Sequence, residues 1–389
     1  MRVLDQSFSV DFQYSVHFTT GLFNKSNSLF SDFLNKHRNK AIEHKILFIL
    51  DKGVVEHHPH LSNSIRRYFE NKEGFLLVDD LLVVNGGEEA KNSSDPVDRI
   101  LDAIDKYGID RHSYICIVGG GAVLDMACFA ASIGHRGIRH IRIPTTVLSQ
   151  NDSGVGVKNG INLGGKKNFI GTFVPPFAVF NDSEFLKTLD NKNWMSGVSE
   201  AIKVGLIKDY AFFEWIEKHA DALVERSQPE MDELIFRCAE IHLQHIRSGD
   251  PFESGSSRPL DFGHWSAHKL EQLNDFDLLH GEAVAIGIAL DAVYSHKIGN
   301  LTLDEAKRVV DLFIRLKLPI DNTHMRASTT ANPLLLGLDE FREHLGGRLC
   351  ITLLEKLGVG KEYHEIHTDK LMESISFLKN YKTTEVTCK

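Results

Sequence analysis

The sequence predicts an α/β domain followed by a mostly α-helical domain. In the first half, short apolar runs alternate with helical stretches of ten or more residues, a pattern typical of parallel strands joined by crossover helices. In the second half, apolar residues recur at three- and four-residue spacings, which is the period of a helix. A chain of 389 residues is long enough for two or three domains. We therefore expect one domain over residues 1–184 and a second over residues 185–389.

The first element expected is an N-terminal strand. Residues 1–18 (MRVLDQSFSVDFQYSVHF) alternate polar and apolar side chains, the period of a strand with two different faces. They lack the basic start and the apolar core of a signal peptide. Three more apolar runs, at residues 45–51 (KILFILD), 76–85 and 113–118 (SYICIV), predict further strands.

Helices are expected between and after these strands. One covers residues 92–107, where Ser93 or Ser94 precedes Pro96 at the position of a helix cap. In the second half, residues 248–257 (SGDPFESGSS) form a polar loop. The helical stretches of that half are residues 185–220, 229–246, 263–273, 281–298 and 303–316.

Composition excludes several classes of protein. With 44 basic and 53 acidic residues, the chain has a formal charge of −9, so an extended nucleic-acid surface is not expected. No apolar stretch approaches the roughly 20 residues that span a bilayer, so no membrane partner is expected. Five cysteines, an odd number without a CxxC pair, indicate reduced thiols and a cytoplasmic protein.

Two segments are suited to bind phosphate. Gly119, Gly120 and Gly121 separate an apolar strand from a helical run, so backbone N–H groups and the start of a helix are available to an anion. A tight turn without a ligand is the alternative. Residues 144–171 combine hydroxyls, glycines and three lysines (Lys158, Lys166 and Lys167), and a solvated loop is the alternative there.

A group of histidines suggests a metal site. His264 and His268 lie four residues apart, on one face if the segment is helical, and His280 opens the next apolar stretch. Two histidines and one carboxylate are a common catalytic zinc arrangement. The spacing leaves the carboxylate open among Glu200, Glu271 and Glu282, and a pair of core or surface histidines is the alternative.

Several ordered motifs resemble the sugar phosphate cyclases, the superfamily of 3-dehydroquinate synthase. They are GGGAVLDMACFAASIGHRGIRHIRIPTTVLSQNDSGVGVKNGIN, GKKNFIGTF, GVSEAIKVGLIKD, DFGHWSAH and LLHGEAVAIG, all between residues 113 and 287. The resemblance implies an NAD-binding α/β domain, a helical metal- and substrate-binding domain, and a homodimer. It implies Glu200, His264 and His280 as ligands of Zn2+, with Co2+ as another possible metal.

The resemblance also implies roles for further residues. The positions that match NAD contacts are Asp51, Glu88, Lys91, Gly120, Gly121, Asp125, Thr145, Thr146, Asp152, Lys167 and Thr188. Those around the substrate are Lys158, Asn168, Lys203 and His268. Arg136 matches an arginine that the family donates across the dimer. The implied reaction oxidises a hydroxyl of a phosphorylated keto sugar with NAD+, eliminates phosphate, returns the hydride and closes a carbocycle by an intramolecular aldol step.

Four positions depart from 3-dehydroquinate synthase. Asp261 stands where that enzyme has asparagine, and His242 and His344 stand near two expected lysines. Arg258 lies six residues before the zinc histidine, where seven is usual. The exchanges remove positive charge and add negative charge, which disfavours a substrate bearing both carboxylate and phosphate.

Asp261 and the EHLGG segment resemble the sedoheptulose 7-phosphate cyclases of the 2-epi-5-epi-valiolone synthase type. We therefore expect a lyase that eliminates phosphate from a keto-sugar phosphate with a neutral end, such as sedoheptulose 7-phosphate. Authentic 3-dehydroquinate synthase activity, a metal-dependent alcohol or glycerol dehydrogenase, and a non-catalytic protein that binds NAD and metal are the alternatives.

Overall fold

The chain forms two compact units in the computed structural model. Unit 1 comprises Met1–Pro144 and Val157–Asp182, and unit 2 comprises Thr145–Gly156 and Ser183–Lys389. The structure describes residues 2–164, 166–248, 251–252, 260–326, 332–344 and 349–387, without the side chains of 339, 343–344 and 382–387.

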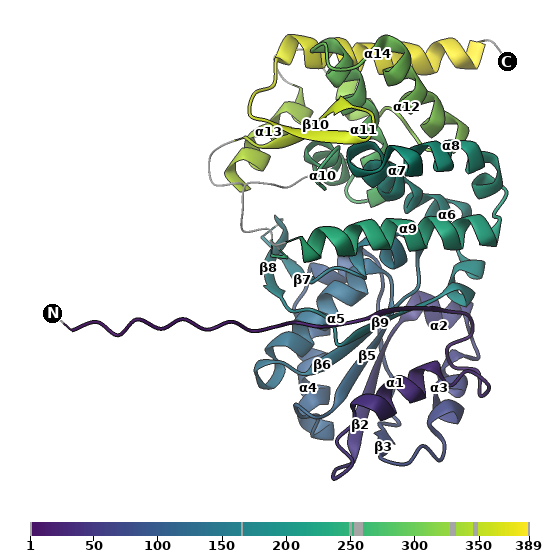
Figure 1. Ribbon diagram of the computed structural model, residues 1–389, viewed down its shortest axis with the longest axis vertical. Helices are drawn as coiled ribbons and strands as arrows, with labels where there is room; N and C mark the ends of the chain where they lie inside the picture. The colour runs from purple at the N-terminus through teal and green to yellow at the C-terminus, as the bar shows by residue number, and fades with distance from the viewer. Residues whose placement is uncertain are drawn as a thin grey trace. The chain divides into compact units, whose positions relative to one another are not determined.

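Unit 1 is built on a parallel sheet, as the alternating pattern predicts. The strand order is β1-β9-β6-β5-β2-β3, and β4 also pairs with β2 (Figure 1). All of these pairs are parallel. The strands are β1 (Val16–Thr19), β2 (His44–Asp51), β3 (Phe75–Leu77), β4 (Leu82–Val84), β5 (Tyr114–Gly119), β6 (Arg139–Pro144) and β9 (Ala178–Asp182).

Helices cover both faces of this sheet because successive residues of a central strand point to opposite sides. In β2, Leu47 and Ile49 join one apolar core with residues of α4 (Asp95–Tyr107) and α5 (Gly121–Ile133). Phe48 lies on the other face against Phe69 of α3 (Leu61–Phe69), with ring centroids 5.9 Å apart. The remaining helical segments of the unit are α1 (Leu29–His37), α2 (Lys52–His57), η1 (Glu88–Lys91) and η2 (Gly134–Arg136).

Residues 144–171, where a solvated loop was the alternative, contain an antiparallel hairpin. β7 (Lys158–Leu163) pairs with β8 (Lys166–Phe173). The two strands approach closely at Gly160, where a Cβ would lie 2.8 Å from the carbonyl oxygen of Ile170.

Unit 2 is largely helical, as predicted. Its centre is α11, which is buried at almost every position from Gly281 to Ser295 and contacts α7, α10, α12 and α14. The helices are α6 (Asn191–Ser196), α7 (Val198–Lys208), α8 (Tyr210–Val224), α9 (Gln228–Arg247), α10 (His264–Leu273), α11 (His280–Lys297), α12 (Leu303–Arg315), α13 (Pro333–His344) and α14 (Thr368–Thr387). The shorter segments are η3 (Ser149–Ser153), η4 (Ser183–Thr188), η5 (Thr323–Arg326), β10 (Ile351–Lys356) and β11 (Val359–Tyr363).

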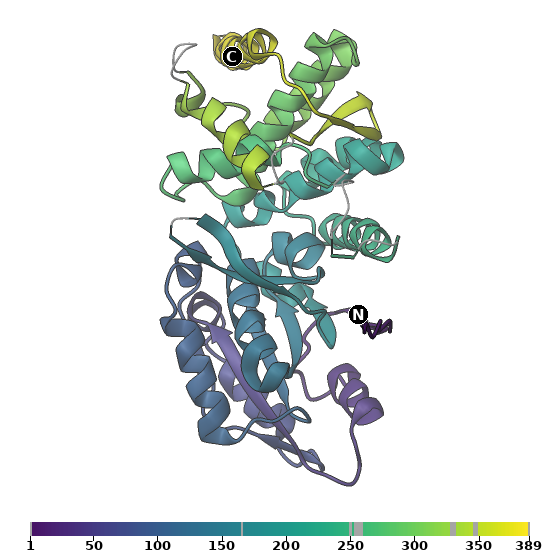
Figure 2. The same cartoon turned by 90° about the vertical axis from the view of Figure 1, so that its left-hand side faces the viewer.

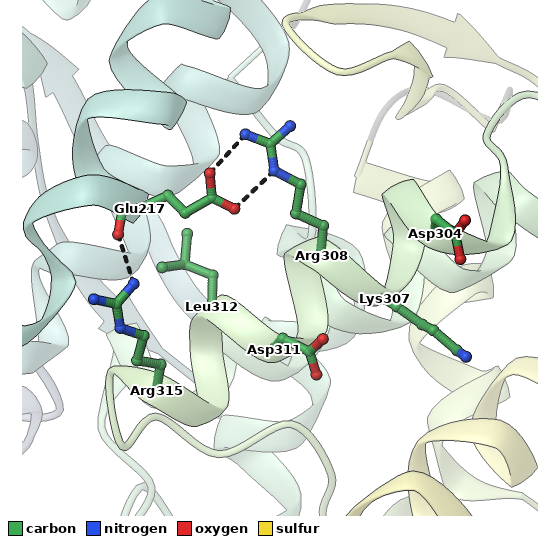
Figure 3. A pocket seen from close by; sticks show the side chains of 7 residues that line it. All are labelled: Glu217, Asp304, Lys307, Arg308, Asp311, Leu312 and Arg315. Carbon is green, nitrogen blue, oxygen red and sulfur yellow. Dashed lines mark hydrogen bonds and ion pairs between the residues drawn. The ribbon is translucent and has the colours of Figure 1, made fainter.

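A surface hollow of about 370 Å³ lies along α12, beside α8 (Figure 3). The carboxylate of Glu217 accepts two hydrogen bonds from Arg308, at 2.7 and 2.6 Å, and its carbonyl oxygen accepts one from Arg315 at 2.8 Å. Because Arg308 and Arg315 already bind Glu217 and thereby hold α12 against α8, we interpret the hollow as part of the packing between these helices and not as a ligand site.

Three sequence expectations differ from the structure. Residues 145–156, placed in the first domain, group with unit 2, where the Asn151 amide donates to the Gly197 carbonyl at 2.7 Å. Residues 76–85 form two short strands instead of one. The N-terminal strand is confirmed only for Val16–Thr19.

None of the helices in the described part of the chain combines the length and hydropathy needed to cross a lipid bilayer.

Candidate metal centre and cofactor-binding residues

Unit 2 brings together the three residues predicted as metal ligands. Glu200 lies in the first turn of α7, and His264 and His280 are the first residues of α10 and α11. Oε1 of Glu200 is 3.4 Å from Nε2 of His264 and 3.4 Å from Nε2 of His280. One ligand atom from each residue lies within 4.8 Å of the others.

The other ring nitrogen of each histidine has an acceptor. Nδ1 of His264 is 3.1 Å from the carbonyl oxygen of Phe262, and Nδ1 of His280 is 3.2 Å from Oε2 of Glu271. A proton on each Nδ1 satisfies both contacts and leaves the Nε2 lone pairs directed toward Glu200. This is the tautomer that a histidine metal ligand requires.

The cluster fits a divalent cation. Both carboxylate oxygens of Glu200 are buried. Oε1, which faces the two imidazoles, accepts no hydrogen bond of ordinary geometry from the described residues, and Oε2 is ion-paired with Lys203. Ligands bound at about 2.0–2.1 Å in a tetrahedron lie roughly 3.4 Å apart, which matches the two nitrogen-to-oxygen distances. Imidazole and carboxylate donors suit Zn2+ and also Co2+.

The spacing of the sequence left three carboxylates as candidates for the third ligand, and the structure distinguishes them. Glu200 faces both imidazoles, whereas Glu271 contacts His280 from the far side of the ring. Glu282 caps the start of α11, because its Oε2 accepts the backbone N–H of Leu279 at 3.1 Å. His268 joins Glu271 and His280 in a second grouping within 4.8 Å, because residues 264, 268 and 271 share one helix face.

A buried carboxylate, Asp291, fixes the start of α10. It accepts hydrogen bonds from the backbone N–H of Gly263 and from Nε1 of Trp265, both at 3.0 Å. Burial raises the pKa of Asp291 to about 7, although both hydrogen bonds act in the opposite direction. Gly263 has φ +79°, and a Cβ on Gly287 would lie 2.0 Å from the Gly263 carbonyl oxygen. His264 is therefore positioned by neighbours that sequence reasoning missed.

Charges of opposite sign alternate around the cluster of Glu200, His264 and His280. Lys203, almost fully buried and one turn along α7, is ion-paired with Oε2 of Glu200. Burial alone would raise the pKa of Glu200, but the charge of Lys203 holds it well below its usual range. Burial alone would lower the pKa of Lys203, but Glu200 and Asp152 raise it. Lys203 therefore stays protonated over the physiological pH range.

Asp152, predicted as an NAD contact, lies within unit 2 beside His242. Its Oδ1 is 2.7 Å from Nδ1 of His242, which lies on α9. Burial would raise the pKa of Asp152, but Lys203 and His242 outweigh it, and the net shift is downward. The ring of His242 is thus in contact with a carboxylate. The sequence placed His242 near an expected lysine but did not predict this contact.

In unit 1, Asp51 ends β2 and caps α2. Its Oδ1 accepts the backbone N–H of Gly53 at 2.8 Å, and a Cβ on Gly86 would lie 2.5 Å from the same oxygen. Burial raises the pKa of Asp51, opposed by hydrogen bonds from Gly53 and Gly120. Gly120 caps α5 and Gly121 begins it, so the triglycine lies at a helix N-terminus, as predicted. An acidic strand end beside a glycine turn is typical of nucleotide-binding α/β domains.

Lys91 of unit 1 contacts three other polar side chains. Its ammonium is buried, 2.9 Å from Oδ2 of Asp125 and 3.8 Å from Oε1 of Glu88, and it donates to Oδ1 of Asn168. Asn162 links the cluster, since its amide donates to Glu88 at 3.0 Å and its oxygen accepts the backbone N–H of Asn168 at 2.8 Å. Asn162 was missed, although it lies within the quoted NGIN motif.

The remaining predicted residues differ in how far they are exposed within their own units. Lys158, which begins β7, and Thr188 are exposed, whereas Lys167 on β8 and Asp261 are half-buried. Thr145 is buried, and Thr146 hydrogen-bonds Ser149 at 2.9 Å through their hydroxyls. Arg136 is exposed in a turn and has φ +64°. Arg258 and the side chain of His344 lie outside the described residues.

These features define a class: a parallel α/β unit with the features of a nucleotide-binding domain, and a helical unit that carries a two-histidine, one-carboxylate cluster of metal-ligand type. The chain belongs to the 3-dehydroquinate synthase family. Residues 81–196 match the model described as 3-dehydroquinate synthase N-terminal, and residues 197–336 match 3-dehydroquinate synthase C-terminal. The resemblance stated from the motifs is thereby confirmed.

Three individual proteins are informative. A 3-dehydroquinate synthase of Nitrosospira multiformis is 35% identical over 77% of this chain and 81% of its own. The structure of ValA, a 2-epi-5-epi-valiolone synthase from Streptomyces hygroscopicus with NAD+ and Zn2+ bound, is 27% identical over 97% of this chain and 100% of that chain, with a TM-score of 0.86. A probable glycerol dehydrogenase from Sinorhizobium meliloti is 14% identical over 94% of this chain and 96% of that chain, with a TM-score of 0.59, which indicates a shared fold.

Proposed function

We propose that this protein is a sugar phosphate cyclase that binds NAD and Zn2+ and converts a phosphorylated keto sugar to a carbocycle with loss of phosphate. The observation that carries the proposal is the cluster of Glu200, His264 and His280, with Lys203 beside it, in a member of the 3-dehydroquinate synthase family. ValA, which resembles this chain over nearly its whole length, is described with both cofactors bound.

The chain's own residues suit this chemistry. When bound, NAD+ would take up and return a hydride, and the metal ion would polarise the carbon–oxygen bond being oxidised. Asp51 and the start of α5 would hold the dinucleotide, and Glu200, His264 and His280 would hold the metal ion. Lys203, a protonated buried cation, would stabilise the anionic intermediates that follow.

As substrate we propose a keto-sugar phosphate without a carboxylate, such as sedoheptulose 7-phosphate. Nδ1 of His242 contacts the carboxylate of Asp152, which neutralises positive charge on the ring. This position therefore offers little positive charge to a second anionic group of a substrate. Asp261 adds a negative charge and accepts hydrogen bonds from hydroxyls well. Both differences favour a substrate that carries hydroxyls at the end where 3-dehydroquinate synthase accommodates a carboxylate.

The experiment is a comparison of two substrates. Purified enzyme with NAD+ and Zn2+ is given either sedoheptulose 7-phosphate or the carboxylated heptulosonate phosphate, and phosphate release and the cyclic product are measured. We expect faster turnover of sedoheptulose 7-phosphate. Faster turnover of the carboxylated sugar would support the second candidate, 3-dehydroquinate synthase itself, which the 35% identical relative favours.

Two other outcomes identify the remaining alternatives. NADH that accumulates with an alcohol substrate would indicate a dehydrogenase, a class with which this chain shares its fold. Binding of NAD and zinc without phosphate release from either sugar would indicate a non-catalytic protein. We also propose, from the family resemblance, that the protein is a homodimer to which Arg136 contributes across the interface, and that it works in the cytoplasm.

A further inference from the structure

The hairpin of β7 and β8 contains an irregular step opposite Asn162. Two regular pairs flank this step, Ile161 with Ile170 and Leu163 with Lys166. Between them, residues 167–169 of β8 lie opposite Asn162 alone. Figure 1 labels the two strands, and Figure 2 shows them side by side in blue-green. A β-bulge of this kind bends its strand and turns side chains in a new direction, and bulges are common beside active sites.

Asn168, in the middle of the bulge, is held by the side chain of Asn162. Its backbone has φ +53°, a conformation that asparagine adopts more readily than most residues. Its backbone N–H donates to Oδ1 of Asn162 at 2.8 Å, in place of a carbonyl oxygen of a neighbouring strand. The carboxamide of Asn162 thus supplies the hydrogen bond that regular strand pairing cannot supply to this residue.

The other end of the Asn162 carboxamide is fixed by two acceptors. Its Nδ2 donates to Oε1 of Glu88 at 3.0 Å and to Oδ1 of Asn92 at 2.8 Å. The opposite orientation of the amide would bring its oxygen against both acceptors, so these partners determine which atom faces Asn168. Since Glu88 begins η1 and Asn92 follows it, the side chain of Asn162 joins η1 to the bulge.

The bulge and η1 also meet at the ammonium group of Lys91. Lys91 is 2% exposed, lies 2.9 Å from Oδ2 of Asp125 and donates to Oδ1 of Asn168. A buried ammonium group requires such acceptors. The amide oxygen of Asn168 is therefore bound to Lys91, which leaves the N–H groups of this exposed residue for a ligand.

We propose that Asn162 is a positioning residue, which sets the places of Asn168 and Lys91 by holding the bulge of β8 against η1. The inference rests on the proposed function, since the family resemblance places Asn168 near the substrate and Lys91 near NAD. Asn162 itself is buried, and both ends of its carboxamide already have partners, so it acts through these neighbours. A displacement of about 1 Å in a binding group can lower the rate of a reaction about 100-fold.

Hydrogen–deuterium exchange of the full-length protein tests the hold on the bulge without any substrate. Asn162→Leu is similar in size and removes all three hydrogen bonds of the side chain, so we expect faster exchange in peptides that contain the N–H of Asn168. The matched control is Thr172→Val, which removes a 2.9 Å hydrogen bond between Thr172 of β8 and Ser132 but leaves the bulge intact. Exchange at Asn168 should be unchanged in the control.

NAD+ affinity is a second readout that needs no turnover. Asn162→Leu should weaken NAD+ binding about 10-fold, as for the weakening of one hydrogen bond to a charged group, because Lys91 loses its fixed neighbours. Thr172→Val should bind NAD+ as the wild type does. Isothermal titration calorimetry measures both, and urea unfolding checks that both variants are folded.

Steady-state kinetics tests the effect on the reaction. With the sugar phosphate that the wild type converts, Asn162→Leu should lower kcat/KM on the order of 100-fold. Thr172→Val should leave kcat/KM within about 3-fold of the wild type, because a hydrogen bond lost away from the site affects mainly stability. A general weakening of the hairpin would instead act on both variants.

A reversed pair tests whether the hydrogen bonds of Asn162, and not its volume, are responsible. Asn162→Asp alone brings a second carboxylate against Glu88, where the present contact is 3.0 Å, and should lower kcat/KM. Adding Glu88→Gln restores the total charge and lets an amide at position 88 donate to the carboxylate at position 162. The double variant should have a kcat/KM about 10-fold or more above that of Asn162→Asp and close to that of Glu88→Gln alone.

Unchanged exchange at Asn168 in Asn162→Leu would overturn the proposal, whatever the substrate is. Equal losses of kcat/KM in Asn162→Leu and Thr172→Val, or no gain on adding Glu88→Gln, would leave Asn162 a structural role only and would also reject it. If the wild type converts neither sugar phosphate, the proposed function fails. Exchange and NAD+ affinity then still decide between the positioning of Lys91 and Asn168 by Asn162 and its rejection.

Discussion

Oε2 of Glu271 lies 3.2 Å from Nδ1 of His280, on the opposite side of the imidazole from Glu200. Glu271 is almost completely buried and lies on α10, seven residues after His264. Helix α10 therefore carries both His264, a proposed metal ligand, and the carboxylate that orients His280, another proposed ligand. A carboxylate in this position fixes the ring and its tautomer and raises the basicity of Nε2.

We predict that Glu271→Gln lowers the affinity for Zn2+ by about 10–100-fold, because the amide orients His280 less strongly and withholds the negative charge. Competition with a chromophoric chelator measures this without any substrate. Glu282→Gln is the control, since Glu282 caps the same helix through an oxygen that glutamine retains. Equal zinc affinities for the two variants would contradict the orienting role.

Asp291 makes folding stability depend on pH. Its pKa in the folded protein is raised to about 7 from 3.8, chiefly by burial. Between these values the unfolded chain has lost the proton that the folded chain keeps, so stability falls as pH rises. The contribution is fully present below pH 4 and is lost as pH passes through about 7.

We predict that the free energy of unfolding of the wild type, relative to Asp291→Asn, falls by about 2–3 kcal/mol between pH 5 and pH 8. Asparagine has no titrating proton, so the difference isolates Asp291. Urea unfolding of both proteins in chelator, at the two pH values, measures it. A difference that stays constant or grows with pH would show that Asp291 is ionised in the folded state throughout.

Gly287 lets α11 approach the start of α10. A Cβ there would lie 2.0 Å from the carbonyl oxygen of Gly263, which is backbone and cannot turn aside. We predict that Gly287→Ala lowers the free energy of unfolding by about 1–3 kcal/mol and weakens zinc binding, because it displaces the residue preceding His264. Gly53→Ala, where the nearest atom is 3.4 Å away, should have little effect. Denaturant unfolding and zinc titration of both variants test the comparison.

The sequence was most informative where chemistry is local. The parallel sheet follows from apolar runs such as residues 45–51, and the metal cluster from His264, His280 and the motif around Glu200. Asp291 and Glu271 were not assigned their roles because each acts through a contact 9 to 28 residues away. An acid in an otherwise apolar stretch, as Asp291 is within residues 283–294, is a signal that a partner must exist.

Other features could not be predicted from the sequence because they also depend on contacts between distant residues. The grouping of residues 145–156 with unit 2 depends on contacts such as that of Asn151 with Gly197, 46 residues later. The contact of His242 with Asp152 spans 90 residues. Alternation alone predicted a strand over residues 1–18, but a strand also needs a neighbour to pair with, and this chain supplies one only from Val16 onward.

The charge difference at positions 242 and 261 predicts how substrate choice can be reversed. His242→Lys adds a cation that Asp152, 2.7 Å from the present ring, only partly neutralises, and Asp261→Asn removes an anion. We predict that the double variant raises kcat/KM for the carboxylated heptulosonate phosphate relative to sedoheptulose 7-phosphate by about 10-fold or more, since each added charge interaction contributes roughly 1 kcal/mol.

The control must carry the same change in total charge without touching the site. Glu240→Lys meets this need, because it lies on α9 two residues before His242, is exposed, and adds the same formal charge as the double variant with histidine neutral. Its ratio of kcat/KM values should remain that of the wild type. If Glu240→Lys shifts the ratio as far as the double variant does, long-range attraction of the dianion explains the effect. If neither protein shifts it, His242 and Asp261 do not select the substrate, and the basis for preferring a sugar without a carboxylate is removed.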